Sequence, residues 1–372
     1  MNHKITVPLL DLARQHQPLE KDFMNAFKRV LGRQRFLNGP EIETLESEFA
    51  AWCEQPQAVA CSSGSTALYI ALKTLGIGPG DEVITTPFTF IATVEAIRLA
   101  GAMPVFVDVD PRTGLMNIEQ IETALTPKTA AVLFVHLYGQ PGPMSDLRFL
   151  CDRYGLALIE DAAQAHGAAW EKRRVGFWGD MACFSFYPTK NLGGLGDGGM
   201  IVTRDTALAE RARRIRNHGR EGHYYHVEFG FNFRMNEIQA ALLRAKLPHL
   251  NEWIRKRNVI VLRYHREVQN PHLTWICTLE GATPAWHLAT LRTPSRDRLQ
   301  QWLTNHRIGH AVHYPRPLHQ QPALRSAYRA PVPLTGAEQL ASEVLSVPLF
   351  PELAESEVDY IIDVLNAFQP ES

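Results

Sequence analysis

Short apolar runs alternate with helical segments along the chain as far as Thr203. Several runs are apolar at successive positions, which is typical of strands buried on both faces of a parallel sheet. The segments between them carry apolar residues at helical spacing, as expected of helices that cover the sheet. We therefore predict an α/β domain. The predicted strands are 59–61, 82–85, 104–107, 130–135, 156–160, 182–186 and 200–203, and the intervening helices include 66–75, 93–99 and 145–154.

After Thr203 the pattern becomes mainly helical, and an arginine-rich helix over 250–268 is long enough to connect two domains. A chain of 372 residues also exceeds the roughly 250 to 300 residues that one core organises. We expect an N-terminal arm and a large α/β domain over 1–250, and a small α+β domain over 251–372. The other predicted elements are helices 206–217 and 237–246, strands 274–278, 286–291 and 308–314, a helix that begins at 295–297, and two closing helices.

The charges are balanced, with 38 Lys and Arg against 39 Asp and Glu and a net charge of -1. No field of one sign is available to hold nucleic acid or an anionic membrane, so we expect neither as a partner. The five cysteines are scattered and contain no C-x-x-C pair, which argues against a disulfide framework and a zinc site. We therefore expect no metal. Because the chain shows neither an export signal nor about 18 consecutive apolar residues, we expect a cytoplasmic protein.

Lys190 follows the predicted strand 182–186 directly. Burial there would disfavour the ammonium form and lower the pKa of the lysine, as a Schiff-base nucleophile requires. The alternative is a loop lysine whose stem reaches to water. The glycines at 194–199 match the G-x-G-x-x-G pattern of dinucleotide-binding proteins, but a strand follows them where that motif needs a helix. We interpret them as a tight reversal beside the lysine.

Two further segments place polar groups at the same edge of the predicted sheet. Asp161 ends a buried strand, where its carboxylate could pair with a cation or could cap a helix starting at 162–164. Glu160 should point to the opposite face. The turn SSGSTA at 62–67 precedes a helix, so it could bind phosphate or act as a cap alone. A lysine, an acid and a phosphate turn together predict pyridoxal phosphate as cofactor.

The chain resembles the DegT/DnrJ group of nucleotide-sugar aminotransferases, which are fold-type I pyridoxal phosphate enzymes. This resemblance implies a mostly parallel seven-stranded sheet with helices on both faces and a smaller C-terminal α+β domain. The segments that carry it extend over nearly the whole chain: PLLD at 8–11, FLNGPE at 36–41, SSGSTAL, GDEVITTPFTFIAT, EDAAQAHG, SFYPTKNLGGLGDGGM, GFNFRMNEIQAALL, HYPRPLH and LSVPLFPEL.

The resemblance also implies roles for individual residues. Lys190 forms the Schiff base and then moves a proton between cofactor and substrate, while Asp161 binds the pyridine nitrogen. Phe90 stacks on one face of the ring, although alone it would be expected in the core. Gln164 lies on the other face or near the ring hydroxyl. The phosphate ligands implied are Ser65, Thr66 and Ser185.

Asn232 resembles an asparagine donated by the neighbouring subunit, which implies a homodimer with shared sites; without the family it would be a turn residue. Arg234 is the candidate for binding a substrate anion. Tyr187, His313 and Tyr314 match positions that line the sugar pocket. Without the family pattern, these three would be expected to be strand-end aromatics and a histidine bonded to the backbone.

The implied activity is the transfer of an amino group from L-glutamate, or glutamine, to a keto carbon of a nucleotide-linked deoxy-sugar. The form YPTKNLGGLGDGG looks more like that of family members acting at carbon 3 than at carbon 4, so the resemblance slightly favours carbon 3. One alternative is a regulator that binds the cofactor without catalysis, against which Lys190 and Asp161 argue. Another is a dehydratase, but relatives with that activity replace the lysine by histidine, whereas Lys190 is retained.

Overall fold

The computed structural model describes residues 5–325 and 327–370. Its main sheet has seven strands in the order β1-β9-β8-β5-β4-β2-β3. β9 is antiparallel to both of its neighbours, and the other neighbouring pairs are parallel. The prediction of a mostly parallel seven-stranded sheet is therefore confirmed. The strands are β1 (Gln57–Cys61), β2 (Glu82–Thr85), β3 (Met103–Phe106), β4 (Thr129–Val135), β5 (Ala157–Asp161), β8 (Met181–Ser185) and β9 (Gly199–Thr203).

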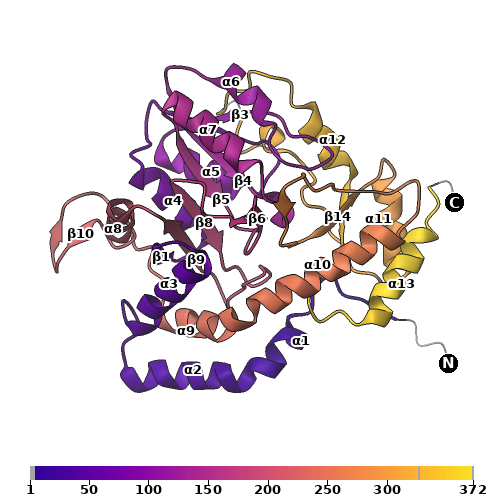
Figure 1. Ribbon diagram of the computed structural model, residues 1–372, viewed down its shortest axis with the longest axis horizontal. Helices are drawn as coiled ribbons and strands as arrows, with labels where there is room; N and C mark the ends of the chain where they lie inside the picture. The colour runs from indigo at the N-terminus through magenta and orange to yellow at the C-terminus, as the bar shows by residue number, and fades with distance from the viewer. Residues whose placement is uncertain (1–4, 326, 371–372) are drawn as a thin grey trace.

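Helices surround this sheet, and α10 extends from it toward the C-terminal part of the molecule (Figure 1). The six helices predicted before residue 270 correspond to α4, α5, α7, α8, α9 and α10, whereas α1, α2, α3 and α6 were not predicted. These helices are α1 (Leu12–His16), α2 (Glu20–Arg33), α3 (Pro40–Trp52), α4 (Gly64–Thr74), α5 (Ala92–Ala100), α6 (Ile121–Ala124), α7 (Met144–Tyr154), α8 (Thr206–Ile215), α9 (Glu237–Lys246) and α10 (Leu250–Glu267).

The alternation of side chains along each strand builds one apolar core on each face of the sheet. In β1, Val59 and Cys61 pack in the core that contains the apolar residues of α4 and α8. Ala58 and Ala60 point to the other face and pack with apolar residues of α3 and α9. Both faces are thus covered, which is why these strands are apolar at successive positions.

The C-terminal part contains an antiparallel sheet with the order β12-β14-β15. The prediction of a strand over 308–314 was wrong: this segment makes only isolated bridges, from Ile308 to Val7 and from Ala311 to Ser346. The bridging partner changes from Val7 at Ile308 to Ser346 at Ala311, so no continuous ladder of hydrogen bonds forms. The third strand is β15, which was not predicted. The elements are β12 (Thr274–Trp275), β14 (Ala289–Arg292), α11 (Arg296–Asn305), α12 (Thr335–Glu343), β15 (Val344–Val347) and α13 (Glu355–Asn366).

Several two-residue strands pair outside the seven-stranded sheet. β6 (Ala169–Trp170) pairs with β7 (Arg173–Arg174) and with β13 (Ala282–Thr283). β10 (Arg220–Glu221) and β11 (Tyr225–His226) form a hairpin that projects beyond α8 (Figure 1). No helix of the described residues combines the length and apolar character needed to cross a bilayer. The division of the chain at residue 250, where α10 begins, stays a prediction.

Candidate functional site

A cavity of about 490 Å³ lies where β5 and β8 end, as expected for a ligand site at the carboxyl edge of an α/β sheet. Nine of the twelve predicted site residues line it, and Thr66, Asn232 and Arg234 do not. The lining residues among those predicted are Ser65, Phe90, Asp161, Gln164, Ser185, Tyr187, Lys190, His313 and Tyr314.

Asp161 is the last residue of β5 and is 6% exposed. Its Oδ2 accepts a hydrogen bond from the Thr93 hydroxyl at 2.8 Å, and its Oδ1 accepts one from the amide of Ala163 at 3.2 Å. Burial raises the pKa of this carboxyl, while both hydrogen bonds and the charge of Lys190 oppose that rise. No helix begins at 162–164, so the capping alternative was wrong. The arrangement leaves a buried carboxylate that a further cation would stabilise.

Lys190 lies in the turn after β8, where its amide donates to the carbonyl of Tyr187 at 2.9 Å. Its side chain is partly buried and lines the cavity together with Asp161. Burial lowers the pKa of Lys190 to about 8, against the opposing charge of Asp161. At pH 7 an amine with this pKa is neutral in about a tenth of molecules, far more than an exposed lysine, and the neutral amine is the form that attacks a carbonyl.

The N-terminus of α4 lines one end of the cavity through Ser63, Gly64 and Ser65. Ser63 and Thr66 make a reciprocal capping box, so the Thr66 hydroxyl is used within the turn and does not reach the cavity. Ser65 and Ser185 do line the cavity. A Cβ on Gly64 would lie 2.7 Å from that of Ser185, so only glycine lets the end of β8 approach the helix. Free amides of the first turn and two hydroxyls suit a phosphate.

Aromatic and amide groups form the opposite wall. Phe90 is 56% exposed, so the core alternative was wrong, and its ring centroid lies 6.1 Å from that of Tyr314. Gln164 accepts from the amide of Tyr138 at 2.7 Å and donates to the hydroxyl of Tyr314 at 3.1 Å. These bonds fix the amide plane of Gln164 beside the cavity.

Glu160 lies on the other face of the sheet, as predicted, and is fully buried. Its carboxylate accepts from three backbone amides, of Gly176, Trp178 and Gly179, and lies 2.9 Å from Nε2 of His136. Glu160 therefore fixes the loop after β7, while its neighbour Asp161 faces the cavity.

Some residues of the site were not predicted. His287 lines the cavity, is 7% exposed and has a buried Nδ1 without a hydrogen-bond partner among the described residues. Burial and neighbouring cations hold its pKa well below the usual range. Thr93 was placed on a predicted helix without a role. Thr93 belongs to the segment GDEVITTPFTFIAT, but that segment does not show its partner, and His287 lies outside every quoted segment, so each reaches the site through tertiary packing. The cavity also includes Ser63, Thr89, Thr189 and Asp197.

Asn232 and Arg234 follow the β10-β11 hairpin, outside the cavity of their own chain. Oδ1 of Asn232 accepts from Nε of Arg234 at 3.1 Å, and Nη1 of Arg234 donates to Oδ1 of Asn217 at 2.9 Å. Both side chains are therefore held by local contacts and do not line the cavity of their own chain.

The model of the DegT/DnrJ/EryC1/StrS aminotransferase family matches residues 17–366. The chain belongs to this family. The assignment confirms that the protein is an aminotransferase of fold-type I and that its cofactor is pyridoxal phosphate. No group of His, Cys, Asp and Glu in the described part of the chain could hold a metal ion.

Curated relatives match over nearly their full length. The chain is 44% identical to a dTDP-3-amino-3,4,6-trideoxy-alpha-D-glucose transaminase of Streptomyces venezuelae, over 97% of this chain and 95% of that protein. It is 41% identical to a UDP-N-acetyl-3-dehydro-alpha-D-glucosamine 3-aminotransferase of Acidithiobacillus ferrooxidans, over 98% of this chain and 99% of that protein. It is also 46% identical to the erythromycin biosynthesis sensory transduction protein EryC1 of Saccharopolyspora erythraea, over 97% and 99%.

Solved structures agree with the fold. DesV of S. venezuelae, crystallised with a ketimine intermediate, gives a TM-score of 0.94 at 44% identity, covering 97% of this chain and 98% of that one. NtdA of Bacillus subtilis, with bound cofactor PMP, gives a TM-score of 0.89 at 30% identity, covering 98% of this chain and 85% of that one. The residues of this cavity fit such a cofactor: an amide-rich turn suits its phosphate, a buried carboxylate suits a ring cation, and a lysine of lowered pKa suits its aldehyde.

Proposed function

We propose that this protein transfers the amino group of L-glutamate to carbon 3 of a nucleotide-linked 3-keto-deoxy-sugar. The observation that carries the proposal is that Lys190 and Asp161 share one cavity with the anion-binding turn of α4. The choice of carbon 3 is supported by the names of two relatives, both of which are described as acting at that position. Four of the five free cysteines are buried, which suits the reducing cytoplasm where we place the reaction.

In this proposal the bound pyridoxal phosphate supplies an electron sink next to the carbon that gains or loses its proton. Lys190 would hold the cofactor through its Nζ, and the same Nζ would accept and return that proton. Asp161 holds a proton on the pyridine nitrogen through its negative charge. The remaining predicted contacts are Ser65, Ser185 and, through the turn, Thr66 for the phosphate, Phe90 and Gln164 for the ring, and Tyr187, His313 and Tyr314 for the sugar.

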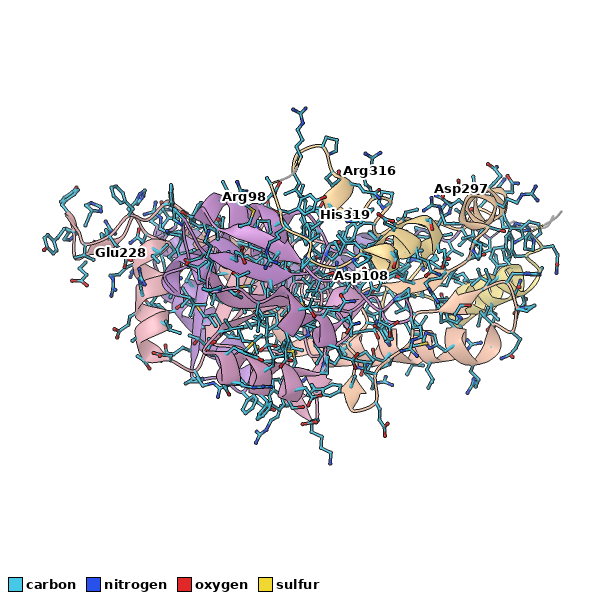
Figure 2. The ribbon with its side chains drawn as sticks, turned by 90° about the horizontal axis from the view of Figure 1, so that it is seen from above. Arg98, Asp108, Glu228, Asp297, Arg316 and His319 are labelled. Atoms are coloured by element: carbon cyan, nitrogen blue, oxygen red, sulfur yellow. The ribbon has the colours of Figure 1, made fainter. Side chains whose placement is uncertain are left out.

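We further propose a homodimer in which Asn232 and Arg234 reach the partner's cavity, Asn232 to the cofactor phosphate and Arg234 to a substrate anion. The segment that carries them exposes large aromatics: Tyr224 is 91% exposed and Phe229 is 99% exposed. Figure 2 shows this segment, at Glu228, at one end of the molecule. Apolar groups clustered in this way are typical of a protein interface.

The decisive experiment uses glutamate labelled with ¹⁵N in its amino group and a panel of dTDP- and UDP-linked 3-keto and 4-keto sugars. We expect the label in the 3-amino product of at least one 3-keto sugar, and none with Lys190→Ala. Label only in 4-amino sugars would contradict the position, and label only from glutamine would contradict the donor. No labelled sugar from any member of the panel would contradict the substrate class.

A regulator that binds the cofactor without catalysis is the second candidate, because one relative carries the name of a sensory transduction protein. Glutamate alone separates the two functions. An aminotransferase exchanges the absorbance of its lysine-bound cofactor for that of the amine form when glutamate is added without a sugar. An unchanged spectrum with glutamate, glutamine and other amino acids favours the regulator.

A further inference from the structure

Two threonines form a hydrogen-bonded chain that ends on Asp161. Thr93 lies in the first turn of α5, and its hydroxyl donates to Oδ2 of Asp161 at 2.8 Å. The hydroxyl of Thr89 lies 3.2 Å from that of Thr93. The three residues are 4%, 1% and 6% exposed in the order Thr89, Thr93 and Asp161. All three line the cavity, yet little of each side chain is exposed, so the two contacts are largely enclosed by protein.

The direction of this chain follows from the donors available. An ionised carboxylate only accepts, so the single hydroxyl hydrogen of Thr93 is committed to Asp161. Thr89 must then be the donor in its contact with Thr93. A hydrogen bond received by Thr93 polarises its hydroxyl and strengthens the one that it donates. Both threonines thus act on the same carboxylate oxygen.

Asp161 depends on this chain because few other groups oppose the effect of its burial. Among the described residues its Oδ1 has one donor, the amide of Ala163, and the charged group that acts on it from the same cavity is Lys190. Among the influences that favour ionisation, the hydrogen bond from Thr93 is the largest.

We propose that Thr93, supported by Thr89, is a positioning residue that holds Asp161 ionised and in the orientation in which it binds the pyridine nitrogen. The inference rests on the role of Asp161 given above. Thr93 acts through Asp161, because its only donated hydrogen is already used there. Removing that hydroxyl should weaken binding of the cofactor even though the phosphate turn is untouched.

The test is the affinity of the apoprotein for pyridoxal phosphate, measured by equilibrium titration. A hydrogen bond to an ionised group corresponds to about one to two decades in an equilibrium constant. We therefore expect Thr93→Val to raise the dissociation constant about 10- to 100-fold. Thr93→Ser, which keeps the hydroxyl, should retain most of the wild-type affinity. Thr89→Val should give a smaller loss. Thr85→Val is the matched control, because Thr85 is equally buried and donates at 2.9 Å to the carbonyl of Leu133, away from the cavity.

The double variant with Asp161→Asn separates the possible failures. If the chain acts through the carboxylate, Thr93→Val should cause no further loss in the Asp161→Asn background. Wild-type affinity in Thr93→Val, or an equal loss in both backgrounds, overturns the inference. If Thr93→Val does not fold, unchanged affinity in Thr89→Val overturns it. Wild-type affinity and absorbance in Asp161→Asn instead overturn the proposed role of Asp161 itself.

Discussion

Replacing Lys190 by alanine should abolish turnover and at the same time stabilise the cofactor-free protein. The pKa of Lys190 falls from 10.5 to about 8 on folding because burial disfavours the ammonium. At about 1.36 kcal/mol per pKa unit, this fall corresponds to about 3 kcal/mol of destabilisation at pH 7. Solvent in the open cavity screens the charge and reduces the gain. We therefore expect Lys190→Ala to raise the free energy of unfolding by about 1 to 3 kcal/mol.

The pH dependence gives the sharper test. Because the folded pKa lies below the unfolded one, the destabilisation is complete below pH 8 and disappears as the pH rises to about 10.5. Urea unfolding of both apoproteins between pH 7 and 10.5 should show the difference shrinking to zero. The exposed Lys128→Ala is the control and should change neither stability nor turnover. A less stable Lys190→Ala at pH 7, or a difference independent of pH, would refute the reasoning about burial; wild-type turnover would refute the role of Lys190.

Three other outcomes are expected. Glu160→Gln places an amide against three backbone donors and should lower the free energy of unfolding by about 3 kcal/mol in urea titrations. The exposed Glu280→Gln is the control and should leave the free energy of unfolding unchanged. Equal effects of the two changes would contradict the role of Glu160 in the loop after β7. Phe229→Asp should shift the mass measured by light scattering from dimer toward monomer, and an unchanged mass would place the interface elsewhere. Asn232→Ala should lower cofactor affinity about 10- to 100-fold, and mixing it with Lys190→Ala subunits should restore activity in hybrid dimers; hybrids without recovery would contradict a shared site.

Local patterns in the sequence were sufficient for most of the large sheet. β8 is buried at every position and β5 ends on two acids, so both strands and the placement of Asp161 followed from side-chain alternation. Lys190 and the turn at Ser65 could be found because each follows a strand at the same sheet edge. These features depend on residues that are close together in the chain.

Contacts between distant segments could not be predicted in this way. The partner of Thr93 is 68 residues away, and His287 reaches the cavity from a loop of the C-terminal half. The segment 308–314 has the composition of a strand, but its neighbours Val7 and Ser346 come from opposite ends of the chain and interrupt the ladder. The hydroxyl of Thr66 completes the capping box, so the predicted contact of Thr66 with phosphate could come only through the turn. In each of these cases the contact depends on which donor or strand lies nearest in the folded chain.

Trapping with borohydride tests the central claim most directly, because it shows both the covalent link and its loss on amino transfer. The holoprotein is reduced with and without prior addition of glutamate, digested, and examined by mass spectrometry. Without glutamate, the phosphopyridoxyl group should be found on the peptide that contains Lys190. After excess glutamate, that adduct should disappear and the free amine form of the cofactor should be recovered. An adduct on another lysine, such as the buried Lys246, would contradict the account. So would an adduct on Lys190 whose amount stays the same after glutamate is added.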